Sequence, residues 1–303
     1  MGESNKGSIQ VILNSAYADE EISGSHHLFY FTEPIQPLPH HIMSISLQTF
    51  QMPYSFYNIN AYNNKLVLEV TNYGMYTLTL DEKNYTASTL STEITTQFAA
   101  VEGTIGTVIV CTYNSYTLKF TLTSTLETIK LDSDSTIGTI MGINFSTDID
   151  VSFALSITMS NVMNLGGIPN VYIKTPNLSF NNESSNVNIR NYLSAVPVSQ
   201  NWGEYILFRP NVPLTIKIAN KSIEYLEIQL VDDDNQEIEI NGVEYTMHLV
   251  IEFHNIIKED LTKAYVQLKN YDQETFLGID SGDKIKREKS KVKQLKKTSK
   301  HKK

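Results

Sequence analysis

Short runs of residues suited to β-strands, separated by turn signals about every 8–12 positions, recur along most of this 303-residue chain. The chain holds 31 Ile, 28 Thr and 17 Tyr but 10 Ala. β-Branched and aromatic side chains fit a pleated sheet, whereas Ala-poor sequences form few long helices. The pattern therefore predicts an all-β protein, and a single antiparallel jelly-roll sandwich is the commonest large architecture of this kind. The predicted strands are residues 28–32, 43–49, 65–71, 75–80, 106–112, 116–122, 127–131, 151–159, 170–174, 205–208, 214–218, 223–230, 237–240 and 246–253.

Three segments depart from the strand rhythm. In residues 88–100, Leu90, Ile94 and Phe98 recur every four positions behind Ser88, which predicts a short helix with Ser88 as its N-cap. A helical turn is expected over 136–142, and a helix over 256–268.

These patterns divide the chain into five parts. Residues 1–27 are expected to form an N-terminal arm, either flexible or exchanged as a strand with a neighbour. The jelly-roll core is assigned to 28–61 and 151–256, with 62–150 as an insertion subdomain of strands and a helix. A C-terminal helix or linker over 257–283 precedes a basic tail.

The net charge of −9 is distributed unevenly. Residues 284–303 hold eleven Lys or Arg and one acid, a net +10, which leaves the preceding residues at −19. Such a tail binds phosphates in a salt-sensitive way, acts as a nuclear import signal, or only solubilises the chain. Contact with the acidic bodies of neighbouring subunits is a further alternative. The residues expected to contact DNA or the inner capsid are Lys284, Lys286, Arg287, Lys289, Lys291, Lys293, Lys296, Lys297, Lys300, Lys302 and Lys303.

Catalytic motifs are missing from the sequence. It contains no phosphate-binding GxxxxGK[ST] loop, no HExxH and no GxSxG. Cys111 lies within an apolar run and is expected to be a buried, inert thiol. The sequence therefore predicts a protein that is not an enzyme and has no cofactor.

Metal binding is also disfavoured. His26-His27 and His40-His41 are adjacent pairs, so each pair supplies at most one inward ligand on a strand, and surface or interface histidines are expected. The acidic run 232–237 lacks the glycine and the terminal Glu of a calcium loop. A charged hairpin turn is expected there instead.

Neither a membrane span nor a secretory leader is apparent. The longest apolar runs fall far short of the ~20 residues that a spanning helix needs, and residues 1–6 lead into a polar segment. Together with the single cysteine, this is what a protein made in a reducing cytoplasm is expected to show.

Two sets of segments resemble known viral capsid proteins. Residues 168–182, 191–210 and 222–253 resemble the C-terminal half of the penton (vertex) capsid proteins of virophages and polinton-type viruses. The shared features are Val196-Pro197 followed by Trp202-Gly203, and an acidic turn followed by Asn241-Gly242 and a strand. Residues 51–70, 74–80, 88–100 and 136–143 resemble jelly-roll capsid proteins of large DNA viruses. In those proteins a Leu-Gly-Phe-like triplet closes the unit, and here it reads Met141-Gly142-Ile143.

The resemblance implies a jelly-roll subunit that assembles as a homopentamer at the fivefold vertices of an icosahedral double-stranded DNA virus. Its implied partners are a double jelly-roll major capsid protein and, through the tail, packaged double-stranded DNA. The virion would be assembled in the host cytoplasm. The alternative is a receptor- or carbohydrate-binding virion protein, in which Trp202 and exposed Tyr side chains stack on sugars. Because Trp202 lies close to Pro and Gly, a core position is expected for it.

Overall fold

The computed structural model describes residues 7–148, 153–178 and 192–255. The chain divides into two compact units. Unit 1 comprises Met1–Tyr54, Asn170–Glu237 and Gly242–Lys303, and unit 2 comprises Ser55–Pro169 and Ile238–Asn241. The predicted helix over 256–268 and the basic tail lie outside the described residues.

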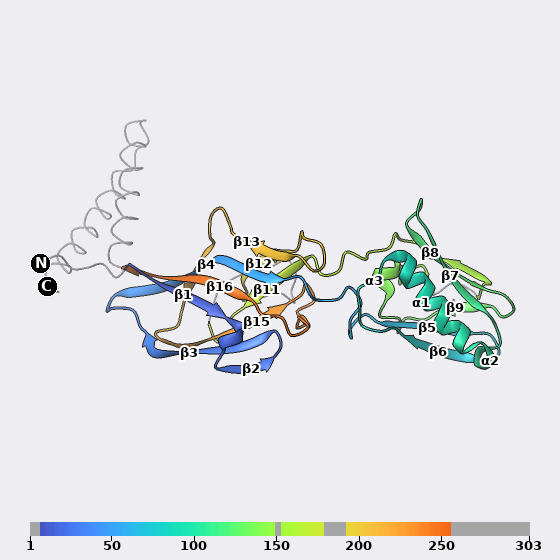
Figure 1. Ribbon diagram of the computed structural model, residues 1–303, viewed down its shortest axis with the longest axis horizontal. Helices are drawn as coiled ribbons and strands as arrows, with labels where there is room; N and C mark the ends of the chain where they lie inside the picture. The colour runs from blue at the N-terminus through green and yellow to red at the C-terminus, as the bar shows by residue number, and fades with distance from the viewer. Residues whose placement is uncertain (1–6, 149–152, 179–191, 256–303) are drawn as a thin grey trace, which may run out of the picture. The chain divides into compact units, whose positions relative to one another are not determined.

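Unit 1 contains two antiparallel sheets (Figure 1). In the first, called the β1/β13 sheet, β1 (Ser8–Asn14), β16 (Thr246–Asn255), β4 (His41–Pro53) and β13 (Tyr205–Phe208) follow in that order, and β14 (Thr215–Ile218) also pairs with β4. In the second, called the β2/β12 sheet, the order is β12 (Tyr192–Pro197), β11 (Asn170–Lys174), β15 (Ile223–Val231), β3 (His26–Ile35) and β2 (Glu20–Ser23).

The strand pairings of unit 1 are nested, so that the earliest strand pairs with the last one and the later pairs lie between them in the sequence. β1 pairs with β16, β3 with β15, β4 with β13 and β14, and β11 with β12, each pair antiparallel. The pairings of β16 with β4 and of β15 with β11 then complete the two sheets. This is the connectivity of a jelly roll. The predicted all-β jelly-roll fold is confirmed.

Side-chain alternation explains why these segments form strands. In β4, a central strand, apolar Met43, Ile45 and Leu47 alternate with Ser44 and Ser46, and all five side chains are buried. In β1, Val11 and Leu13 are buried while Ile12 is exposed. Alternation of this kind is the pattern of a sheet with one face on a core. The N-terminal segment predicted as an arm therefore includes a sheet strand of its own chain, held by seven register pairs with β16.

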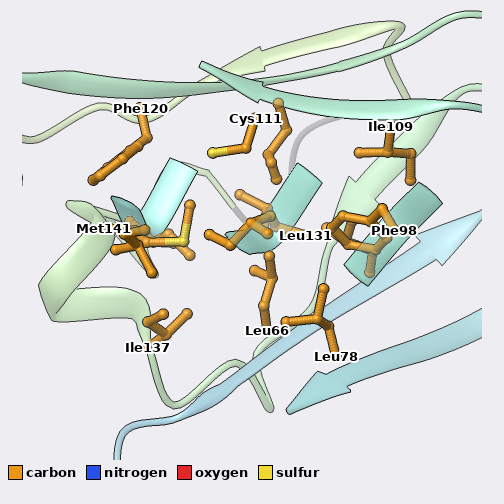
Figure 2. Close-up of a cluster of buried hydrophobic side chains, with 14 of the residues drawn as sticks. Leu66, Leu78, Phe98, Ile109, Cys111, Phe120, Leu131, Ile137 and Met141 are labelled. Carbon is orange, nitrogen blue, oxygen red and sulfur yellow. The ribbon is translucent and has the colours of Figure 1, made fainter. Parts of the chain in front are cut away.

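Most of unit 2, Ser55–Pro169, lies between β4 and β11 in the sequence, and Ile238–Asn241 lies between β15 and β16. One of its three-stranded sheets contains β6 (Gly74–Thr79), β5 (Lys65–Val70) and β9 (Ile129–Leu131), and the other contains β10 (Ser156–Thr158), β8 (Lys119–Ser124) and β7 (Ile109–Asn114). Figure 2 shows Leu66, Leu131, Phe120 and Ile109 from these sheets directed into one apolar cluster, together with Phe98 of α1 (Ala87–Ala100).

Helix α1 follows the predicted four-residue periodicity. Leu90, Ile94 and Phe98 are fully buried, as expected for one apolar face on a core. The N-cap is Thr86 rather than Ser88: its side-chain oxygen accepts the backbone N–H of Thr89, and Thr89 bonds back in a capping box.

Short helical segments complete the described chain. They are η1 (Ser15–Tyr17), α2 (Glu102–Ile105) and α3 (Gly138–Met141), and α3 confirms the predicted turn over 136–142. No helix in the described ranges is long and apolar enough to cross a membrane.

One predicted strand is wrong, and two strands of the β2/β12 sheet were missed. Residues 237–240 form no strand beyond a single bridge from Glu237 to Val231, and Ile238–Asn241 belongs to unit 2. β12 and β2 had no clear strand signal. β12 contains Ser194, Ala195 and Pro197, and β2 is a four-residue edge strand, so propensity was weak in both.

Candidate assembly surface

Large apolar side chains are concentrated on one exposed stretch of unit 1, named the 202–214 surface. Trp202 is 56% exposed, Tyr205 60%, Leu207 51%, Val212 84% and Leu214 61%. The stretch covers β13 and its flanking segments at one edge of the β1/β13 sheet. Large apolar side chains that are exposed so close together in the sequence are typical of a surface that another molecule covers.

The position of Trp202 corrects the prediction of a core tryptophan. Next to it, Gly203 has φ +85° and donates its N–H to the Tyr54 carbonyl at 2.9 Å, while the Tyr54 N–H donates to Glu204 at 2.7 Å. This irregular pairing starts β13 one residue after Glu204 and leaves Trp202 in the preceding turn, outside the sheet. Proximity to Pro and Gly was a signal of that turn and not of burial.

β13 shows the alternation of an edge strand over a core. Ile206 points inward and is 1% exposed, whereas its neighbours Tyr205 and Leu207 face solvent. The 202–214 surface was missed in the sequence because Tyr205–Phe208 reads simply as an apolar run. Only its position at a sheet edge shows which side chains remain exposed.

A polar cluster occupies the β2/β12 sheet around His26. The His26 ring lies 2.8 Å (Nε2) from the Glu227 carboxylate and 3.3 Å (Nδ1) from that of Glu237. Ser23 donates to Glu237 at 2.6 Å and the Gln229 amide donates at 2.8 Å. Burial of Glu237 opposes the effect, but these hydrogen bonds and His26 lower its pKa below the ordinary value. All members have partners, which is the arrangement of a structural network.

His27 contradicts the expectation of surface histidines. It is 4% exposed, and its Nδ1 lies 3.1 Å from the Tyr245 hydroxyl, with the two rings edge to face at 5.3 Å. Burial lowers the pKa of His27, partly offset by Glu21. The alternation that turns His26 outward turns His27 into the core.

The remaining candidate groups show structural contacts. His41 bonds to the Pro39 carbonyl at 3.1 Å, and His254 lies 2.6 Å from the Ser44 hydroxyl. His40 is exposed in a turn with φ +64°. Cys111 is buried as predicted, and burial raises the pKa of its thiol to about 12, far from the value of a reactive thiolate.

The acidic run forms the predicted turn between β15 and Glu237. The Asp232 carboxylate accepts backbone N–H groups of Asp234 and Gln236 at 2.9 and 2.8 Å, and Asn235 takes a positive φ of +63°. Burial nevertheless raises the pKa of Asp232. In the part of the chain that the structure describes, no three His, Cys, Asp or Glu side chains are grouped to hold a metal ion.

The tail residues predicted to contact DNA, Lys284 to Lys303, lie outside the described residues. Their role stays a prediction.

No family model and no curated protein sequence matches this chain. Among solved structures, similarity is found to the crystal structure of the selenomethionine-labelled mavirus penton protein. The TM-score is 0.44 and the sequence identity 14%, over 82% of this chain and 100% of that chain.

Proposed function

We propose that this chain is a structural capsid protein that forms homopentameric pentons at the fivefold vertices of an icosahedral double-stranded DNA virus. The observation that carries the proposal is the exposed apolar 202–214 surface on a jelly-roll sandwich. A surface with five large exposed apolar side chains in thirteen residues suits burial against another subunit. The sequence resemblance to penton capsid proteins points to the same role.

A ring of five identical subunits needs a heterologous contact, in which one side of each subunit meets a different side of the next. A jelly roll supplies suitable sides, because each of its two sheets ends in two different edge strands. Unit 2 supplies an additional body on each subunit.

The remaining roles follow from this one. A double jelly-roll major capsid protein surrounds each penton in the virion, and the basic tail contacts packaged DNA through phosphates. The chain acts by assembly rather than by catalysis. The tail carries no aromatic residue, so its contact with DNA is electrostatic and does not involve base stacking.

Size-exclusion chromatography with light scattering of the full chain tests the proposal. A mass five times the 34.3 kDa subunit is expected at micromolar concentration. A strictly monomeric chain over the whole concentration range contradicts it.

The exposure of Trp202 favours a second candidate, a carbohydrate- or receptor-binding virion protein. Trp202 and Tyr205 are both more than half exposed, and aromatic faces of this kind stack on sugar rings. A glycan array separates the two. Specific glycan binding that is lost in Trp202→Ala supports recognition, and an empty array leaves assembly as the role of this surface.

A further inference from the structure

We propose that the outer edge of β1 in one copy pairs with the outer edge of β13 in a neighbouring copy, so that the β1/β13 sheet continues from subunit to subunit. This inference rests on the proposed function and identifies the contact that builds the ring. Strand addition of this kind satisfies exposed backbone groups on both edges.

Both edges are open on one side within the described ranges. β1 pairs with β16 alone and β13 with β4 alone. The two strands stand at opposite ends of the sheet (Figure 1). A contact between them therefore joins two different surfaces, which is the heterologous geometry that a ring requires.

The backbone of β1 presents a defined set of groups at its open edge. Just beyond its two ends, the Ser15 N–H donates to Tyr245 at 3.0 Å and the Phe253 N–H donates to Gly7 at 3.2 Å. Hydrogen-bonded pairs alternate along an antiparallel ladder, so the odd-numbered residues of β1 bond to β16. The N–H and C=O groups of Gln10 and Ile12 consequently point to the open edge.

The same reasoning applies to β13. Tyr205 is opposite Pro53 of β4, and proline has no N–H to contribute, so these two residues form a non-bonded pair. Alternation then directs the N–H and C=O groups of Tyr205 and Leu207 to the open edge.

The open edges of β1 and β13 match in their height on the sheet and in the face on which their exposed apolar side chains lie. Asn14 is paired to Thr246, Thr246 to Gln51 and Gln51 to Leu207. One row of the ladder thus joins both edges, and they lie at the same height on the sheet. Ile12, two residues from Asn14, shares the outward face with Leu207, and it is 64% exposed.

Pairing of β1 with β13 would place apolar side chains side by side. Ile12 of one copy would contact Tyr205 and Leu207 of the next, as cross-strand neighbours do. Continuation of the sheet in the same sense makes the contact antiparallel, because β1 and β13 run in opposite directions within one subunit.

The edge strands of the β2/β12 sheet differ from β1 and β13 in carrying residues that disfavour pairing with another chain. β2 carries Glu20 and Glu21, and β12 ends in Pro197. Charge and proline at an edge prevent pairing with another chain. β1 (SIQVILN) and β13 (YILF) contain neither, so within unit 1 the edge strands β1 and β13 lack the protection that β2 and β12 have.

Charge substitutions in the full chain test the inference. Ile12→Lys and Leu207→Lys each put a lysine at one edge, and both are expected to raise the half-assembly concentration at least about tenfold, since charges guard edges against pairing. The matched control is Ile22→Lys on β2, where Ile22 is similarly exposed at 54%. This control is expected to assemble like the wild type. In the double variant Ile12→Lys/Leu207→Glu, the opposite charges meet across the contact, and assembly recovers relative to Ile12→Lys.

Hydrogen exchange on the wild type gives an independent measurement. The amides of Gln10, Ile12, Tyr205 and Leu207 are expected to exchange slowly in the assembly and fast in dilute monomer. Fast exchange of these amides in wild-type pentamers overturns the inference, and so does normal assembly of the Ile12→Lys variant. Either result leaves the proposed function standing. Protection that does not depend on concentration also overturns it, because a segment of the same chain then covers the edge. A wild-type chain that never assembles contradicts the proposed function itself.

Discussion

Substituting Gly142 by Ala is expected to destabilise unit 2 much more than the same change at Gly74. Both glycines belong to unit 2 and both have positive φ, +80° for Gly142 and +85° for Gly74. They differ in their surroundings. A Cβ at Gly142 would lie 2.4 Å from the Asn161 carbonyl oxygen and 2.7 Å from that of Val162, whereas a Cβ at Gly74 meets nothing within 4 Å.

The magnitude follows from these contacts. The left-handed backbone costs a residue with a Cβ about 1–2 kcal/mol at either position. At Gly142 the backbone of Asn161 must also move, although its N–H is bonded to the Gly142 carbonyl at 3.0 Å. Forcing atoms into a packed site costs a further ~1–3 kcal/mol. Gly142→Ala should therefore be less stable than Gly74→Ala by about that second amount.

Cys111 provides the assay. It is the one cysteine of the chain and is 3% exposed within unit 2, so a thiol reagent reaches it only when unit 2 opens. Under native conditions the opening equilibrium measured by Cys111 labelling should be roughly five- to 150-fold more favourable in Gly142→Ala than in Gly74→Ala. Equal labelling of the two variants would refute the argument that close approach, rather than φ alone, requires glycine here.

Three further predictions concern the core, the buried histidine and the tail. Phe98→Ala, which empties a fully buried position of α1, should cost about 3–5 kcal/mol in urea unfolding, while Thr96→Ala on the exposed face of α1 should stay within about 0.5 kcal/mol; similar losses would contradict the assigned face. Because burial lowers the pKa of His27 in the folded state, the neutral form is favoured there, and stability should fall as pH decreases below about 6.5. The urea midpoint at pH 5.5 should be lower than at pH 7.5, and the drop should shrink in His27→Phe; an unchanged drop would assign it to other groups. Deleting 284–303 should leave the circular dichroism spectrum intact and weaken salt-sensitive retention of duplex DNA, so equal retention at low salt would rule out the tail as the DNA contact.

Local patterns in the sequence predict much of this fold. The spacing of Leu90, Ile94 and Phe98 predicts α1, because a helical face is set by residues four apart. The Asn72-Tyr73-Gly74 turn predicts the β5–β6 hairpin, and in the structure both Asn72 and Gly74 adopt positive φ.

Long-range pairing is where sequence reasoning fails. β1 pairs with a strand more than 230 residues further along the chain, and no local signal specifies that partner. The same limit accounts for His27 and Trp202. Which face of a strand is buried, and where a strand begins, depend on the register with its neighbours.

The 202–214 surface could be predicted from the sequence only in part. The apolar residues of 202–214 are visible in the sequence, but their exposure depends on the position of β13 at a sheet edge. The charges of the tail can be counted directly, and that prediction needed no fold.

Electron microscopy of assembled particles, with this chain tagged or fitted as a rigid jelly roll, tests the central claim most directly. The account predicts density for this chain in rings of five at the fivefold vertices. Density for it at any other position of the shell, or its absence from the shell, would contradict the account.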